Sequence, residues 1–155
     1  MGDFSAGVYG IDEIIGCGTE FRPPFFGQSV QHRPVGFIGV GGVIRDETGM
    51  FKKAMCKQPR GSWSAREAEA LSLKKVLSWM KTHGFTNCIF ETNSKLLADA
   101  CNGSVGRSYF HSIVTDCIEL FKHFENVLVR FVPRSANEVA HLLARVSRSM
   151  SGSQE

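Results

Sequence analysis

Strand-like and helix-like patterns of apolar residues alternate from Val35 to about residue 148, and this alternation limits the possible folds more than any other feature. Two β-rich runs, 37–45 and 50–57, flank a short polar turn that ends in Gly49, and together they predict a hairpin. The segments that follow are expected to be a helix over 64–82, a strand over 86–92, helices over about 94–101 and 108–124, a strand over 127–132 and a helix from Asn137 to about 148. Strands followed by alternating helices predict an α/β fold in which helices cover a mixed β-sheet.

The first strand of the hairpin is rich in glycine, with Gly39, Gly41 and Gly42 close together. Because glycine weakens the interior of a strand, this composition indicates that another element packs closely against it. No helix follows the GVGG sequence, so it is not a dinucleotide-binding motif.

Capping signals and periodicity define the helices. Ser64 and Glu67 have the spacing of a capping box, and Gly84 is suited to end the same helix. The apolar stripe of this helix consists of Leu73, Val76, Leu77 and Met80. The helix over 108–124 has an apolar side formed by Phe110, Ile113, Cys117, Leu120, Phe121 and Phe124. The last helix is expected to bury Val139, Leu142, Leu143 and Val146.

Composition excludes several classes of protein. The 155 residues suit one domain, and a net charge of +3 permits a nucleic acid partner without requiring one. The five cysteines are scattered and form no CxxC pair, so we expect no disulfides and no zinc site. No apolar run approaches the roughly 20 residues that span a bilayer. We therefore expect no membrane partner and an intracellular protein, nuclear or cytoplasmic, without a secretory signal.

Glu69 is the first candidate for a functional residue. It precedes Leu73, Val76 and Leu77 at helical spacing, so its carboxylate lies on the apolar stripe of the helix, near the N-terminal end. An acid in this position can simply interact favourably with the helix dipole, but Glu67 already does so on another face. Periodicity alone leaves a structural and a functional role equally open.

Glu91 and Asn93 are two residues apart at the end of the strand over 86–92, so they point to the same face. Open α/β sheets commonly place their functional sites at such strand ends. The competing interpretation is that Asn93 or Ser94 only caps the next helix.

Two further residues come from the C-terminal part of the chain. His141 lies off the expected apolar stripe of the last helix, where a histidine is usually a surface residue. Arg134 lies in the loop between the last strand and the last helix and is a candidate phosphate contact.

Four segments, GVGGVIRDETG, SAREAEALSLKKVL, FETNSKLL and RFVPRSANEVAHLLAR, occur in the order found in the ribonuclease H family. The chain most closely resembles the plant branch of reverse-transcriptase-like domains related to retrotransposons, over residues 35–148. The resemblance implies a ribonuclease H-like fold and cleavage of the RNA strand of an RNA–DNA hybrid. In that family four carboxylates hold two Mg²⁺ ions that activate a water and stabilise the leaving oxygen.

The resemblance assigns one of the four carboxylates clearly. The family's helix glutamate corresponds to Glu69, whereas two of its aspartates correspond to Asn93 and His141. No residue of 27–43 matches the first aspartate, and Asp12 is too far away in sequence. Glu91 shares a face with Asn93, so it is a candidate to compensate in part and to hold Mg²⁺ together with Glu69.

The expected organisation is an irregular N-terminal segment over 1–34, a ribonuclease H-like domain over 35–148 and a polar tail over 149–155. The N-terminal segment either lacks the family's first strand or replaces it, and Val8–Ile15 is the stretch suited to do so.

Three functions remain open. The chain is an RNA–DNA hybrid ribonuclease with a degraded ligand set, a non-catalytic nucleic-acid-binding domain, or a relic or protein-interaction domain of the same fold. The oligomeric state is open as well.

Overall fold

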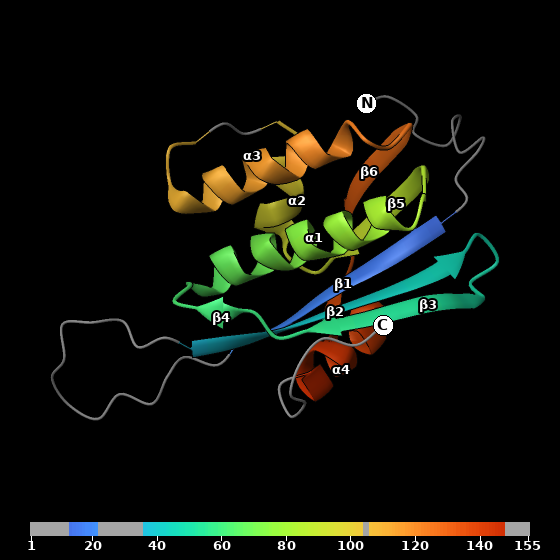
Figure 1. Cartoon of the computed structure of the whole chain (residues 1–155), viewed down its shortest axis with the longest axis horizontal. Helices are drawn as coiled ribbons and strands as arrows, with labels where there is room; N and C mark the ends of the chain where they lie inside the picture. Colours follow the sequence, from blue (N-terminus) through green and yellow to red (C-terminus); the bar gives the residue numbers. More distant parts are fainter. Residues whose placement is uncertain (1–12, 22–35, 104–105, 148–155) are drawn as a thin grey trace, which may run out of the picture.

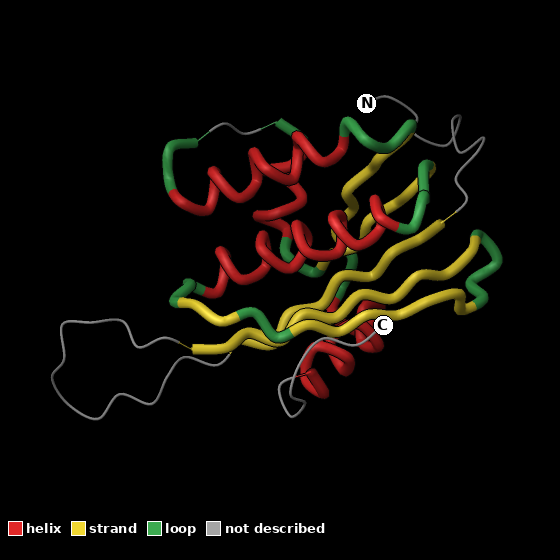
Figure 2. The backbone as a smooth tube through the Cα atoms, in the orientation of Figure 1, coloured by secondary structure: helices red, strands yellow, loops and turns green. Residues whose placement is uncertain are grey.

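The computed structural model describes residues 13–21, 36–103 and 106–147. Its elements are β1 (Glu13–Phe21), β2 (Gly36–Asp46), β3 (Phe51–Lys57), β4 (Arg60–Gly61), α1 (Ala65–Thr82), β5 (Asn87–Thr92), α2 (Lys95–Cys101), α3 (Tyr109–Phe121), β6 (Asn126–Phe131), the 3₁₀ turn η1 (Arg134–Asn137) and α4 (Glu138–Ser147). The main sheet has the strand order β3-β2-β1-β5-β6, and β4 pairs with the start of β2. The strands β3, β2 and β1 are antiparallel neighbours, whereas β1, β5 and β6 are parallel, which confirms the predicted mixed sheet (Figures 1 and 2).

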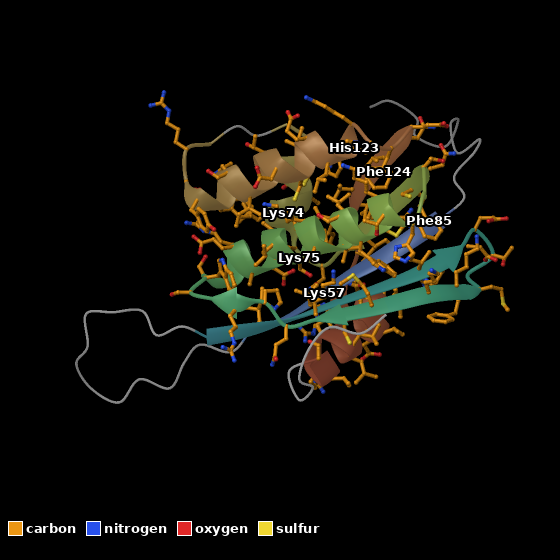
Figure 3. All side chains as sticks on the ribbon, in the orientation of Figure 1. Lys57, Lys74, Lys75, Phe85, His123 and Phe124 are labelled. Atoms are coloured by element: carbon orange, nitrogen blue, oxygen red, sulfur yellow. The ribbon has the colours of Figure 1, made fainter. Side chains whose placement is uncertain are left out.

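Helices cover both faces of the sheet. Figure 1 shows α1, α2 and α3 together on one face and α4 alone on the other. The first face holds the main hydrophobic core, because large apolar side chains of the sheet and of three helices meet there. The largest fully buried side chains are Phe90, Phe110, Ile38, Ile44, Met55, Leu73, Leu77, Met80, Leu97, Val40 and Val76. The outer side of this layer is charged, and Lys74 of α1 forms a 2.6 Å ion pair with Asp116 of α3 (Figure 3).

The helix signals in the sequence are confirmed. The Ser64 hydroxyl accepts a hydrogen bond from the Glu67 backbone N–H, and the Glu67 carboxylate accepts one from the Ser64 N–H at 2.8 Å, so the capping box is complete. Gly84 has a φ of 73°, which suits the residue that ends α1. The hydroxyls of Ser94 and Ser108 cap α2 and α3 in the same way as Ser64 caps α1.

The N-terminal segment is not wholly irregular, because β1 lies within it. This strand lies between β2 and β5 at the centre of the sheet, so the first strand of the fold is present and β2 is not a sheet edge. Only residues 13–15 of the expected strand Val8–Ile15 coincide with β1, and residues 8–12 lie outside the described residues. The strand was hard to recognise because Gly16 and Gly18 interrupt its apolar pattern.

The predicted buried stripe of α4 is wrong. Val139, Leu142 and Val146 are 58%, 57% and 43% exposed, and the buried side chains are those of Ala140, His141, Ala144 and Ser147. The reason lies in the glycines of β2. A methyl group on Gly39 would overlap the carbonyl group of Ala144, and one on Gly41 would overlap the carbonyl oxygen of Ala140. The backbones of β2 and α4 approach so closely that only small side chains fit between them.

Both edges of the sheet have distinctive features. The edge strand β3 carries the exposed lysines Lys52 and Lys53, and its pairing with β2 is irregular between Ile44 and Arg45. At the other edge, the side-chain amide of Asn102 donates a hydrogen bond to the carbonyl oxygen of Val129 in β6 at 3.1 Å.

Two further findings concern the described residues only. The cysteines Cys56, Cys88, Cys101 and Cys117 are free thiols, and burial raises the pKa of Cys101 to about 12. Among the helices of 13–21, 36–103 and 106–147, none has the length and apolar character needed to cross a membrane.

Candidate functional site

Asn93 and His141, 48 positions apart in sequence, meet on the α4 face of the sheet. The amide oxygen of Asn93 lies 2.7 Å from Nε2 of His141, and the imidazole is only 3% exposed. Because a carbonyl oxygen can only accept, Nε2 carries the hydrogen in this arrangement and donates it. The bond therefore joins two groups that carry no negative charge, at the two positions where the resemblance places aspartates.

The residue that caps α2 is Ser94 and not Asn93. Ser94 is the N-cap of α2, since its hydroxyl accepts from the Leu97 backbone N–H at 3.3 Å. The Asn93 side chain is instead directed at α4, which brings the end of β5 and the side of α4 together.

Glu91 lies two residues earlier on the same face and is held by two arginines. The residue as a whole is 6% exposed, and one carboxylate oxygen accepts from Arg45 of β2 at 2.8 Å while the other accepts from Arg130 of β6 at 2.5 Å. Arg130 is the direct partner of Glu91 in the β5–β6 ladder. Both oxygens of Glu91 are therefore engaged by cations of the protein itself.

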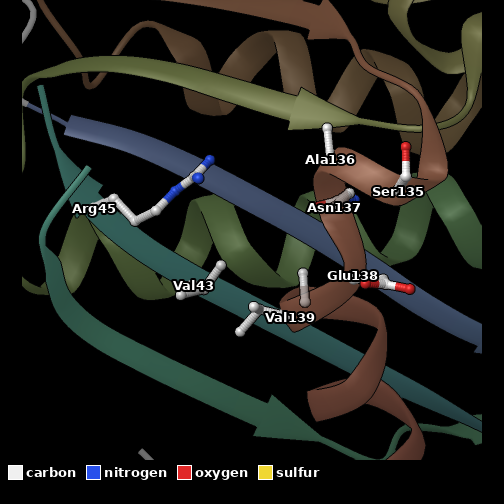
Figure 4. A pocket seen from close by; sticks show the side chains of 8 residues that line it. Val43, Arg45, Ser135, Ala136, Asn137, Glu138 and Val139 are labelled. Carbon is white, nitrogen blue, oxygen red and sulfur yellow. The ribbon is translucent and has the colours of Figure 1, made fainter. Parts of the chain in front are cut away.

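Arg45 reaches Glu91 by crossing over β1. The β1 residue opposite Glu91 is Gly16, and Figure 4 shows the Arg45 side chain extending from β2 over β1. A Cβ atom at position 16 would lie 2.7 Å from the amide oxygen of Asn137. Glycine at this position thus leaves space for the Asn137 side chain.

Two positions of β1 that face α4 are occupied by glycine. Gly16 faces α4, and Gly18 is the ladder partner of Gly41, which also faces α4. Side chains alternate along a strand, so both of these α4-facing positions of β1 are glycines. Asp12, the nearest preceding aspartate, lies outside the described residues.

Glu69 is half-buried and belongs to the helix layer on the opposite face of the sheet. The loop over 83–86 reverses the chain between α1 and β5, so the two elements run in opposite directions. The rise per residue of a helix and of a strand places Glu69 and Asn93 each about 20 Å from that loop. Glu69 therefore lies at the same end of the sheet as Asn93 but approaches from the other layer.

Arg134 is exposed and begins η1. Together with His141 it lines a hollow of about 360 Å³ whose other lining residues are Glu138, Val139, Leu142 and Arg145. The candidate phosphate contact and the buried histidine thus border the same part of the surface.

These residues do not fit a pair of magnesium ions. Within the described part of the chain, no group of three or more His, Cys, Asp and Glu side chains could hold a metal ion. Asn93 and His141 are hydrogen-bonded to each other, and Glu91 is neutralised by two guanidinium groups. Mg²⁺ prefers oxygen ligands with negative charge, and neither Asn93 nor His141 supplies one, while both oxygens of Glu91 are engaged by arginines.

Sequence reasoning missed Arg45, Arg130 and Asn137. The position of Arg130 opposite a buried acid on the neighbouring strand can be detected only once strand pairing is known. Arg45 and Asn137 become recognisable only when β1 is placed between β2 and β5, because Arg45 reaches Glu91 across β1 and Asn137 lies against Gly16.

Comparison with solved structures defines the class of protein as the ribonuclease H fold. The RNase H1 of the halophilic archaeon Halobacterium salinarum NRC-1 is 19% identical, with a TM-score of 0.75 over 88% of this chain and 97% of that one. LC11-RNase H1 in complex with RNA/DNA hybrid is also 19% identical, with a TM-score of 0.73 over 90% and 99%. The foamy viral protease-reverse transcriptase in complex with RNA/DNA hybrid is 12% identical, with a TM-score of 0.68 over 88% of this chain and 20% of that protein.

The family model described as reverse transcriptase-like matches residues 27–147, and the chain belongs to this ribonuclease H-like family. A comparison with curated proteins gave no match. The resemblance seen in the four sequence segments is thereby confirmed at the level of family and fold.

Proposed function

We propose that this chain binds RNA–DNA hybrid or a related nucleic acid duplex without cleaving it. Membership of the family supports a nucleic acid ligand, and so do the similar structures that contain RNA/DNA hybrid. The mild positive charge of the chain is compatible with such a ligand.

The hydrogen bond between Asn93 and His141 carries the non-catalytic part of the proposal. In the related family, metal-dependent cleavage requires carboxylates at both positions, and here the two side chains satisfy each other. Glu69 is the one carboxylate of the family set that matches, and a single carboxylate is too little charge to hold two divalent cations.

The test measures binding and cleavage of the same labelled RNA–DNA hybrid. We expect the natural chain to bind with an affinity that falls as salt rises, and to leave the hybrid intact in Mg²⁺ or Mn²⁺. An Asn93→Asp/His141→Asp variant and a Glu69→Gln variant are run beside it, each checked for folding by circular dichroism.

Cleavage by the natural chain that disappears in Glu69→Gln would overturn the proposal. Cleavage by the double variant alone would show that the two substitutions silenced a centre that is otherwise intact. If all three proteins bind but remain inert, restoring carboxylates at positions 93 and 141 is not enough for cleavage, and the non-catalytic proposal stands.

A protein-interaction domain is the second candidate, and one observation favours it. Val139, Leu142 and Val146 expose apolar surface along one side of α4, next to Arg145. Exposed apolar side chains that lie together are typical of binding surfaces. Absence of any salt-dependent hybrid binding would favour this second function.

A further inference from the structure

One buried acid and two arginines form an ion-pair cluster that consists of Glu91, Arg45 and Arg130. The cluster carries a net charge of +1. The Glu91 side chain is 8% exposed, whereas those of Arg45 and Arg130 are 35% and 45% exposed. A buried carboxylate needs a partner, and one arginine is enough to neutralise it. The second arginine therefore leaves positive charge that the cluster does not use.

The guanidinium groups also keep most of their hydrogen-bond donors. Each guanidinium has five N–H donors, and each uses one Nη2 atom to bind Glu91. The Nε atom of Arg45 is buried, and no described group of the protein accepts its hydrogen. Buried donors are nearly always paired, so the ion pair with Glu91 alone does not satisfy this guanidinium group.

A hollow of about 200 Å³ borders Arg45 on the side of η1 and α4. Val43, Ser135, Ala136, Asn137, Glu138, Val139 and Ala140 complete its lining (Figure 4). Glu138 is the acid on its rim and is exposed, so water screens its charge, whereas Glu91 is already neutralised. The hollow therefore gives access to Arg45 from solvent. Its lining residue Ala140 directly precedes His141, so the hollow lies next to the Asn93–His141 pair.

We infer that Arg45 and Arg130 bind one phosphodiester group of a nucleic acid backbone, with Glu91 as the positioning residue that fixes both guanidinium groups. This inference rests on the proposed function. A phosphodiester offers two anionic oxygens, which match the paired N–H donors of a guanidinium group. Such a contact positions the protein on a backbone without reading its bases. The cluster thus supplies a fixed protein cation beside a site that does not fit a metal.

The first test compares single variants in hybrid binding over a range of salt concentrations. Arg45→Gln and Arg130→Gln are each expected to weaken binding several-fold and to lower the slope of log K against log salt by about 1. Arg107→Gln is the matched control, because Arg107 is an exposed arginine that precedes α3 and lies outside the cluster. It should leave affinity and slope unchanged.

The Glu91→Gln variant distinguishes a cluster that binds a phosphodiester from a cluster that only stabilises the fold. It raises the net charge of the cluster from +1 to +2, so the phosphodiester site predicts a steeper salt slope, and the loss of one acceptor for the guanidinium groups limits the gain in affinity. A cluster that only stabilises the fold predicts a lower melting temperature with no gain in affinity. Equal affinity and slope in Arg45→Gln, Arg130→Gln and the natural chain would overturn the inference.

Titration of the natural chain with inorganic phosphate keeps this inference distinct from the proposed function. The ¹⁵N resonances of Arg45 Nε and Arg130 Nε are expected to shift and saturate, while that of Arg107 stays constant. Shifts without hybrid binding would refute the proposed function and retain the anion site. Hybrid binding without shifts, and with unaltered arginine variants, would refute the anion site alone.

Discussion

The two faces of the sheet are packed in opposite ways. Under α1, α2 and α3, large side chains such as Leu73, Leu77 and Phe90 fill a deep apolar core. Under α4, glycines of β1 and β2 meet Ala140 and Ala144, and backbones touch almost directly. Large buried side chains stabilise the first face, whereas the second face requires small residues because the backbones of its strands and of α4 lie so close together. The functional candidates Asn93, His141 and Glu91 all belong to the second face.

The largest expected effect lies on the first face. Leu77→Ala removes a fully buried side chain and should lower the free energy of unfolding by about 2–5 kcal/mol, because a cavity adds to the lost transfer free energy. Urea denaturation followed by circular dichroism measures it. A loss below about 1 kcal/mol would contradict the picture of a tightly packed core.

On the second face, adding volume should be the damaging change. Gly39→Val places branched carbons where the Ala144 carbonyl lies, and we expect a loss of about 1–3 kcal/mol or more. The same denaturation experiment applies, with Val146→Ala on the exposed side of α4 as the control. If Gly39→Val had the same free energy of unfolding as the natural chain, α4 would be able to move away from the sheet without loss of stability. The proposed difference in packing between the two faces would then be wrong.

The outward side of α4 provides a sharper test with a smaller effect. Leu142→Gln should change the free energy of unfolding by no more than about 0.5 kcal/mol, since this side chain is 57% exposed. If α4 instead buried its apolar stripe, as periodicity predicts, the same substitution would be strongly destabilising.

The smallest effect concerns the β2–β3 turn, which belongs to neither face. A hydrogen bond from the Thr48 side chain, with backbone N–H groups of Met50 and Thr48, holds the pKa of Asp46 below its usual 3.8. The folded pKa is the lower one, so Asp46 contributes stability above about pH 4 and loses it as pH falls through that lower value. Asp46→Asn should therefore be less stable than the natural chain at pH 7, and the difference should shrink near pH 2. A difference that grows on acidification would contradict this origin.

The same contrast explains what the sequence could predict. Ser64, Glu67 and Gly84 mark the ends of α1 by local chemistry, and the stripe of Leu73, Val76 and Leu77 follows the helical period, so this layer was predicted correctly. Local signals suffice where each element contributes large apolar side chains to a shared core.

The second face could not be derived from periodicity. The most apolar residues of α4 point outwards because its inward side must be small, and that requirement is set by Gly39 and Gly41, about a hundred residues earlier in the chain. β1 was obscured by its own glycines. The ion pairs of Glu91 join residues of β2, β5 and β6, and the sequence of a single strand does not reveal the order of the strands in the sheet. The resemblance assigned Asn93 and His141 to one site, and the structure joins the two side chains by a hydrogen bond.

The edges of the sheet bear on how the protein behaves at high concentration. A strand with unpaired backbone groups invites a strand of another molecule to add to it. Lys52 and Lys53 would meet like charges on a second copy of β3, and the register shift at Ile44–Arg45 disturbs the regular spacing that such addition requires. On β6, Asn102 already occupies the Val129 carbonyl. We therefore expect the purified chain to resist edge-to-edge aggregation, and the millimolar samples that arginine ¹⁵N spectra demand should stay clear.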